Sequence, residues 1–310
     1  MQNAPRPAPP PAGWKARNLV SVDDLTLDEI RFALDLAEHY AGFLKQGARP
    51  PQRLAGKTQV NLFYEDSTRT NLSFALAGQK LGADVINVPV AASSVNKGET
   101  ELDTAQTLAA MGAHALILRH KQPRIHEQLA THIPCPILNA GDGVREHPTQ
   151  ALLDAAAIRS VYGSLEGRVI AICGDIRHSR VAGSDAHLFA KLGAEVRFVG
   201  PAHLMPDATD FPRIKRYDSL KAGLSGADIV MGLRMQVERM GEGGKDAARG
   251  YYETFGLTHE TLKLAKQGAW VMHPGPMNRG VEIDGALADD PERSLVLRQV
   301  FYGVAVRMAC

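Results

Sequence analysis

Short apolar runs alternate with longer amphipathic segments along the chain after residue 18. Runs rich in valine, isoleucine, leucine and phenylalanine are typical of buried strands, whereas apolar residues at helical spacing are typical of helices that cover a sheet. The pattern predicts strands at 59–63, 83–88, 114–118, 135–138, 169–173, 195–199, 229–233 and 269–272. It predicts helices at 70–81, 99–111, 125–131, 147–161 and 181–192.

Strands and helices alternate in two series, before and after the long helix predicted at 147–161. Such alternation is typical of parallel sheets with helices on both faces. The predicted fold class is therefore α/β, with two doubly wound parallel-sheet domains joined near residue 150. A last helical segment, 293–308, places five apolar side chains on one face, namely Leu297, Val300, Phe301, Val304 and Met308.

The composition excludes several classes of protein. The 310 residues include 35 Lys and Arg against 34 Asp and Glu, a formal net charge of +1, whereas nucleic-acid binding usually requires a basic excess. No apolar run approaches the ~20 residues that cross a bilayer, so we expect no membrane span. The three cysteines, Cys135, Cys173 and Cys310, form neither a disulfide framework nor a zinc motif, which favours a cytoplasmic location.

The first 17 residues differ from the rest because their prolines disfavour both helix and sheet. They contain no apolar segment of the kind that a secretory signal needs. We expect a disordered tail, and a docking arm for a partner protein is the alternative.

Two segments resemble nucleotide-binding motifs but lack required residues. The segment 56–58 (GKT) resembles the end of a P-loop, but Pro51 replaces the first glycine and the segment precedes a strand. The segment 141–143 (GDG) is too short for a dinucleotide fingerprint, because Glu146 replaces the third glycine. The sequence supports neither site.

Four consecutive polar residues, Ser67, Thr68, Arg69 and Thr70, lie between a predicted strand and a predicted helix. A helix N-terminus offers backbone N–H groups and the positive end of the helix dipole, and hydroxyls with a guanidinium add further donors. A phosphate site is favoured over simple capping by Ser67 or Thr68, because a cap does not require four polar donors in a row.

His147 lies beside Pro148, which suits the first position of a helix. A neutral imidazole there is suited to donate a hydrogen bond to a carbonyl, and a helix cap explains the same residue equally well. Gln150 follows on the same helix.

Other polar segments follow predicted strands, at the ends where open parallel sheets bind ligands. They are Arg119 with His120, 175–180 (DIRHSR), 234–236 (RMQ) and 273–280 (HPGPMNRG). Within the last of these, Gly275-Pro276 suits a cis bond, although a plain turn is the usual form of this pair. Together they predict a basic cleft for a strongly anionic substrate pair, and its arginines are Arg69, Arg119, Arg180 and Arg234.

The order of these motifs resembles the catalytic chain of bacterial aspartate carbamoyltransferases from about residue 19 to the C-terminus. The resemblance rests on the segments 67–70 (STRT), 97–100 (KGET), 119–120 (RH), 147–150 (HPTQ), 234–236 (RMQ) and 273–276 (HPGP). It implies the carbamoyltransferase fold with an interdomain active-site cleft, a homotrimer, and the committed step of pyrimidine synthesis without cofactor or metal. The domains would then be a tail at 1–18, a carbamoyl phosphate domain at 19–150 completed by a helix in 291–310, and an aspartate domain at 151–290.

The resemblance also implies residue roles. Carbamoyl phosphate would be bound by Ser67, Thr68, Arg69, Thr70, Arg119, His147, Gln150, Gly275 and Pro276. L-aspartate would be bound by Lys97, Arg180, Arg234 and Gln236. The catalytic groups would be Arg69, Thr70, Arg119 and His147. A mobile loop would carry Ser93 and Lys97 into the site of the adjacent subunit.

Some alternatives stay open. Ornithine carbamoyltransferases share the 67–70 motif, but they carry a cysteine where Pro274 stands, and their Asp-x-x-x-Ser-Met-Gly segment is absent. A non-catalytic scaffold is the alternative outside enzymes. Gly183 stands where the family would place an arginine, which puts one contact beside Arg180 in doubt. A separate regulatory chain or association with dihydroorotase also stays open.

Overall fold

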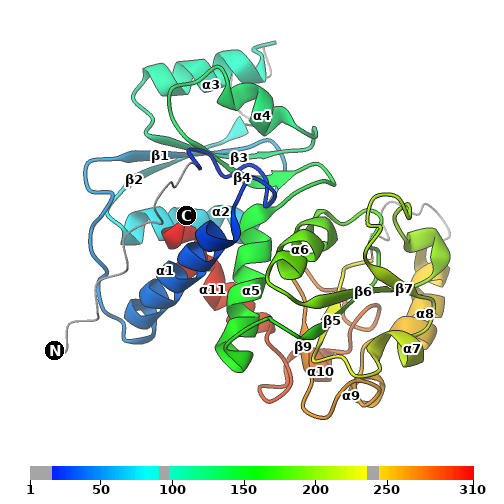
Figure 1. Cartoon of the computed structure of the whole chain (residues 1–310). Helices are drawn as coiled ribbons and strands as arrows, with labels where there is room; N and C mark the ends of the chain where they lie inside the picture. Colours follow the sequence, from blue (N-terminus) through cyan, green and yellow to red (C-terminus); the bar gives the residue numbers. More distant parts are fainter. Residues whose placement is uncertain (1–15, 91–97, 236–243) are drawn as a thin grey trace. The chain divides into compact units, whose positions relative to one another are not determined.

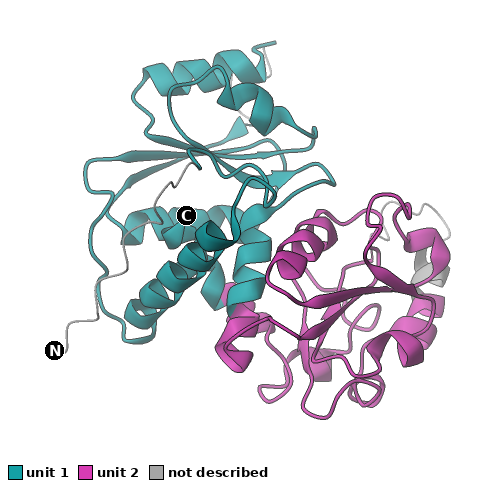
Figure 2. Ribbon diagram, viewed as in Figure 1, with its two compact units in different colours: residues 1–156, 301–310 teal, residues 157–300 magenta. Residues whose placement is uncertain are grey.

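The computed structural model describes residues 16–90, 98–235 and 244–310. Its contacts divide the chain into two compact units, one up to Ala156 together with Phe301–Cys310 and the other Ala157–Val300 (Figure 2). Each unit contains a parallel sheet with helices, which confirms the predicted α/β class. Helices α5 (Pro148–Tyr162) and α11 (Val296–Ala309) each contain a point of division, so no loop marks the change of unit.

The first unit is built around four parallel strands in the order β2-β1-β3-β4 (Figure 1). The strands are β1 (Thr58–Phe63), β2 (Asp84–Val88), β3 (Ala115–His120) and β4 (Ile137–Asp142). The helices that precede α5 are α1 (Leu27–Lys45), α2 (Thr68–Lys80), α3 (Glu101–Ala110) and α4 (Ile125–Ala130). Figure 1 shows α3 and α4 on one face of this sheet and α1 and α2 on the other.

Side chains of β3 alternate between the two faces, as the two-residue period of a strand requires. Leu116 and Leu118 pack with residues of α3 and α4 in one apolar cluster. Ile117 packs with Phe74 of α2 in a second cluster on the other face. On that same side a polar residue of β1 is also buried, and Gln59 Nε2 donates to the carbonyl oxygen of Phe74 at 3.0 Å.

Helix α1 was not predicted, although its start carries a clear signal. Thr26 accepts from the backbone of Glu29, and the Glu29 side chain accepts from Thr26, which forms a capping box. Ile30 and Leu34, one turn apart, are buried along the same face. Charged residues between the apolar positions hide this period from a search for apolar runs.

The second unit contains five parallel strands in the order β7-β6-β5-β8-β9. They are β5 (Val169–Cys173), β6 (Glu195–Val199), β7 (Lys215–Tyr217), β8 (Ile229–Gly232) and β9 (Trp270–Met272). Its helices are α6 (Arg180–Lys191), α7 (Leu220–Leu224), α8 (Gly244–Phe255), α9 (His259–Leu262) and α10 (Gly285–Ala288), with a 3-10 turn at Ala202–Leu204.

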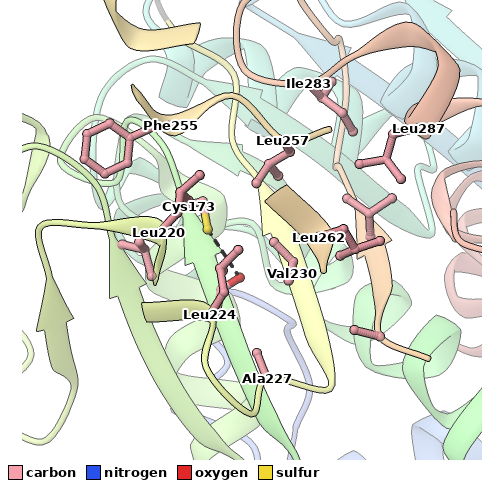
Figure 3. Packing of buried hydrophobic residues seen from close by; sticks show 14 of the residues in the cluster. Cys173, Leu220, Leu224, Ala227, Val230, Phe255, Leu257, Leu262, Ile283 and Leu287 are labelled. Carbon is pink, nitrogen blue, oxygen red and sulfur yellow. Dashed lines mark hydrogen bonds between the residues drawn. The ribbon is translucent and has the colours of Figure 1, made fainter. Parts of the chain in front are cut away.

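One apolar cluster covers a face of this second sheet. Leu220 and Leu224 of α7 pack there with Val230 of β8, and Ile283 and Leu287 belong to the same cluster (Figure 3). This close apolar packing limits the movement of the strands in the second unit.

The last helix forms as predicted, but the first part of its apolar face is exposed. Leu297 is 80% and Val300 53% exposed in α11, whereas Tyr302 is buried. The reason is that polar side chains of α11 find partners in the first unit: Tyr302 Oη donates to Glu38 Oε2 at 2.5 Å. Arg307 Nη1 likewise donates to Ser73 Oγ at 2.6 Å. Polar side chains can be buried when they are hydrogen-bonded, and the spacing of apolar residues does not reveal such burial.

In the part of the chain that the structure describes, no helix combines the length and the apolar character needed to cross a membrane.

His126 of α4 is a fully buried histidine whose Nε2 lies 2.8 Å from the carbonyl oxygen of Leu118. Since a carbonyl only accepts, Nε2 carries the proton. Burial lowers the pKa of His126 from 6.5 to about 4, and the hydrogen bond to Leu118 opposes this shift only in part. Nearby His120 and Arg145 lower the pKa further, and Glu127 raises it.

This lowered pKa predicts a loss of stability in mild acid. The unfolded chain binds a proton at this ring near pH 6.5 and the folded chain only near pH 4, so stability is lost as the pH falls between these values. We expect the free energy of unfolding to fall between pH 7 and pH 5 by about 2 kcal/mol more in the wild type than in His126→Gln. Urea denaturation at both pH values measures this difference, and His132→Gln, at an exposed position, is the control. Equal pH dependence in wild type and His126→Gln would contradict a neutral buried ring.

Candidate active site

The strand order of the first unit creates a switch point between β1 and β3. From β1 the chain crosses to β2 on one side, and from β3 it crosses to β4 on the other side. Ligands of open α/β sheets bind at the carboxyl ends of the strands at such a point. Phe63 is paired with Arg119, and the Tyr64 amide donates to the carbonyl oxygen of Arg119 at 2.9 Å. The loop toward Ser67 therefore leaves β1 beside Arg119.

Helix α2 begins at Thr68, with Ser67 in extended conformation at the N-cap position. The Ser67 side chain makes no capping hydrogen bond, which removes the main reason to regard it as a plain cap. The first turn carries Arg69 and no acidic residue, although the helix dipole disfavours a cation there by about 0.3–1 kcal/mol. An anion bound at this N-terminus would turn the same arrangement into a favourable one.

Arg119 at the end of β3 contacts Ala140 and Glu65. Its Nη1 donates to the carbonyl oxygen of Ala140 at 3.1 Å, and its Nη2 lies 3.5 Å from Glu65 Oε1. Its side chain is only 13% exposed, so its charge is poorly screened by water. The guanidinium is thus a fixed positive group beside the switch point.

His147 and Gln150 lie at the start of α5, as the sequence predicted, with Pro148 as the first helical residue. Gln150 Nε2 lies 3.1 Å from each carboxylate oxygen of Asp154, which is fully buried. Because a carboxylate only accepts, this contact assigns the amide nitrogen to Asp154 and turns the Gln150 carbonyl oxygen away from it. That oxygen is suited to accept from an N–H of a ligand. Asp154, one helical turn after Gln150, was missed by the sequence analysis, although the i,i+4 spacing could have indicated it.

The second unit has its own switch point, between β5 and β8. Gly174 follows β5 with φ of 129°, and a Cβ there would lie 2.6 Å from the carbonyl oxygen of Leu233. The Leu233 amide in turn donates to the carbonyl oxygen of Cys173 at 2.7 Å. Only glycine fits between these strand ends. Arg180 and Arg234 lie on the two segments that leave this point.

The segment from Asp175 to Arg180 is ordered by side-chain contacts. His178 Nδ1 lies 2.8 Å from Asp175 Oδ1, and the Asp175 carboxylate is buried. Ser179 caps α6 by accepting from the Ala182 amide, so Arg180 is the first residue of that helix. The next segment, after β9, contains a cis Gly275-Pro276 bond, the less usual of the two forms that the sequence left open.

Each unit thus gathers its own set of predicted residues, and three predicted residues cannot be placed. The first unit holds Ser67, Thr68, Arg69, Thr70, Arg119, His147 and Gln150, and the second holds Arg180, Arg234, Gly275 and Pro276. Ser93, Lys97 and Gln236 lie outside the described residues. Among the residues that are described, no three His, Cys, Asp or Glu side chains gather in a way that could hold a metal ion.

Comparison with known families gives a direct assignment. Residues 17–160 match the family described as aspartate/ornithine carbamoyltransferase, carbamoyl-P binding domain. Residues 166–310 match its companion, the Asp/Orn binding domain. The chain belongs to the aspartate/ornithine carbamoyltransferase family.

Several relatives within that family are named aspartate carbamoyltransferase catalytic subunit. The chain is 52% identical to the aspartate carbamoyltransferase catalytic subunit of Cereibacter sphaeroides over 297 residues, 96% of this chain and 93% of the relative. The corresponding subunit of Granulibacter bethesdensis is 52% identical over 292 residues, 94% of this chain and 92% of the relative. Aspartate transcarbamoylase from Trypanosoma cruzi, solved with carbamoyl aspartate and phosphate, has a TM-score of 0.87 and 33% identity, covering 97% of this chain and 96% of that one.

Replacing Ser67 by alanine distinguishes two roles of its hydroxyl, ligand binding and helix capping. Since its side chain makes no capping bond, we expect Ser67→Ala to change the free energy of unfolding by less than about 0.5 kcal/mol. The loss of a hydrogen bond to a charged ligand should weaken binding of inorganic phosphate roughly tenfold or more. Calorimetric titration with phosphate and urea denaturation measure the two effects.

Thr26→Ala is the matched control, because the Thr26 side chain does accept from the Glu29 amide, at 3.2 Å. This variant should lose about 1 kcal/mol of stability and bind phosphate normally. If Ser67→Ala behaved like Thr26→Ala in both measurements, the phosphate site would be excluded.

Proposed function

We propose that this chain transfers the carbamoyl group of carbamoyl phosphate to the amine of L-aspartate, which gives N-carbamoyl-L-aspartate and phosphate. The observation that carries the proposal is the presence of guanidinium groups at the switch point of each sheet. Arg119 lies beside the switch point of the first unit, and Arg180 and Arg234 follow the switch point of the second unit. Two anionic substrates need two such basic sites. The related catalytic subunits and the Trypanosoma cruzi complexes support the same activity.

The first unit would bind carbamoyl phosphate. The N-terminus of α2 meets the phosphate with backbone N–H groups, the Ser67, Thr68 and Thr70 hydroxyls, and the guanidinium of Arg69. The carbonyl oxygen of Gln150, turned away from Asp154, accepts from the carbamoyl NH₂ group. Gly275 and Pro276 add backbone contacts to the same ligand.

The second unit would bind L-aspartate. Two carboxylates need two forked cations, and Arg180 and Arg234 supply them by bidentate hydrogen bonds. Gln236 belongs to the same segment as Arg234 and takes part in the same recognition. An acceptor that lacks the second carboxylate leaves one of these guanidinium groups without its partner.

The chemistry then follows from charge and position. The neutral amine of aspartate attacks the carbamoyl carbon, a C–N bond forms, and negative charge grows on the carbonyl oxygen. Thr70, Arg119 and His147 stabilise that oxygen; loss of one such donor typically costs about 10²–10³ in turnover. The C–O bond to phosphate then breaks, Arg69 neutralises the departing phosphate, and the phosphate accepts the amine proton. Positioning and electrostatics supply most of the rate.

The proposal includes the assembly that the family resemblance implies. Three chains form a homotrimer in the cytoplasm, and Ser93 and Lys97 of one chain complete the site of its neighbour. Aspartate carbamoyltransferase would then perform the committed step of pyrimidine synthesis, with a separate regulatory chain or dihydroorotase as further partners. The native mass of the purified protein tests the trimer.

Turnover with two acceptors tests the proposed reaction. Aspartate and ornithine are supplied in parallel with carbamoyl phosphate, and the carbamoylated product is measured. We expect product with aspartate only. Product with ornithine would assign the other branch of the family, and no product with either would favour a scaffold.

Replacement of Arg69 is the most stringent single-residue test of the proposed reaction. We expect Arg69→Ala to lower turnover at least about 10³-fold, because it removes both a phosphate contact and charge neutralisation of the leaving group. Circular dichroism and the unfolding midpoint should remain those of the wild type. Arg31→Ala, which removes an exposed arginine of α1, is the control and should retain full activity. Substantial turnover in Arg69→Ala would contradict the assigned role.

A further inference from the structure

One buried carboxylate, Glu282, contacts both segments that follow β8 and β9. It is 1% exposed. Its Oε2 accepts from the Met235 amide at 3.3 Å, and its Oε1 accepts from the Asn278 amide at 2.5 Å and lies 3.2 Å from His273 Nε2. Met235 directly follows Arg234 in the sequence, so the Glu282 side chain holds the backbone next to Arg234.

The protonation of His273 is fixed by its other neighbour. The Gly275 amide donates to His273 Nδ1 at 2.9 Å, so Nδ1 is an acceptor and carries no proton. The proton is therefore on Nε2, which donates to Glu282. The ring is buried, and it links the Glu282 carboxylate directly to the turn at Gly275.

Both backbone groups of Met235 are held. Glu282 accepts from its amide, and Asn278 Nδ2 donates to its carbonyl oxygen at 2.9 Å. The residue after Glu282 is Ile283, which is buried in the apolar cluster of the second unit (Figure 3). The carboxylate therefore projects from a fixed piece of backbone.

The choice of a carboxylate here is chemically specific. Glu282 faces two amide donors and one ring donor, and a carboxylate offers lone pairs to all three. A glutamine would turn an NH₂ group toward one of these donors. Among the described lysines and arginines, none is in ion-pair distance of Glu282. A buried carboxylate without a cationic partner is costly, and its three hydrogen bonds are what stabilise it.

We propose that Glu282 is a positioning residue that orients Arg234 for the acceptor substrate, by fixing the peptide groups of Met235. This inference rests on the proposed function. Glu282 touches no substrate; it acts through the backbone. Its loss therefore weakens recognition of the dicarboxylate acceptor and leaves phosphate recognition in the first unit intact.

Steady-state kinetics of Glu282→Gln test the inference. We expect the KM for aspartate to rise about tenfold or more, kcat to fall less than about threefold, and the affinity for inorganic phosphate to change less than about twofold. Succinate, which has both carboxylates of aspartate and no amine, should lose affinity as a competitive inhibitor by a similar factor. Glu260→Gln, an exposed glutamate of the same unit, is the control and should match the wild type.

A second variant covers the case in which Glu282→Gln fails to fold. Asn278→Ala removes only the bond to the Met235 carbonyl oxygen, and we expect a smaller rise of the aspartate KM, about threefold to fivefold, with phosphate affinity unchanged. If the two single variants fold, the double variant should show less than the product of their effects, because both act on one peptide segment.

A purely structural role predicts lower stability with an unchanged KM for aspartate in the folded protein, and that result would overturn the inference. A wild-type protein without turnover of aspartate would overturn the proposed function and this inference together, whereas an active wild type with an unchanged KM in the variants overturns only the inference.

Discussion

The order of strands in each sheet is the constraint on which the candidate site depends. In both units the chain adds strands on one side, returns, and adds strands on the other. Two neighbouring strands then send their following loops in opposite directions, which leaves their carboxyl ends accessible between the loops. Arg119 stands at such an end in the first unit, and the segments that carry Arg180 and Arg234 leave it in the second. Within each unit, this reversal brings strand ends that are distant in sequence next to one another.

Two buried carboxylates support the polar groups that surround these strand ends. Asp154 faces the amide nitrogen of Gln150, and Glu282 faces only N–H donors. In each case the acceptor fixes the orientation of a neighbouring group that could otherwise rotate or shift. A ligand that meets groups held in this way does not need to order them on binding, which favours both affinity and rate.

Local patterns predicted much of the fold. The strands at 169–173 and 195–199 have the predicted bounds, because buried parallel strands are short apolar runs between breaks. Helix α1 was missed because charged residues between its apolar positions hide the helical period. The burial of Tyr302 in α11 could not be predicted, because it depends on Glu38, a partner distant in the sequence. The motif residues were found because they are consecutive in sequence. Glu282 was not, because its partner Met235 lies 47 residues away, and no local pattern reports such a contact.

The return of α11 to the first unit affects the order in which the chain can fold during synthesis. Phe301–Cys310 belong to the first unit, where Arg307 bonds to Ser73 and stands over the ring of Phe74. Burial lowers the pKa of Arg307 to about 10, yet the group keeps its charge at neutral pH. A ribosome needs on the order of ten seconds to add the intervening residues 157–300. Throughout that time the first unit lacks residues 301–310, so the nascent protein exposes an incomplete surface until these residues emerge.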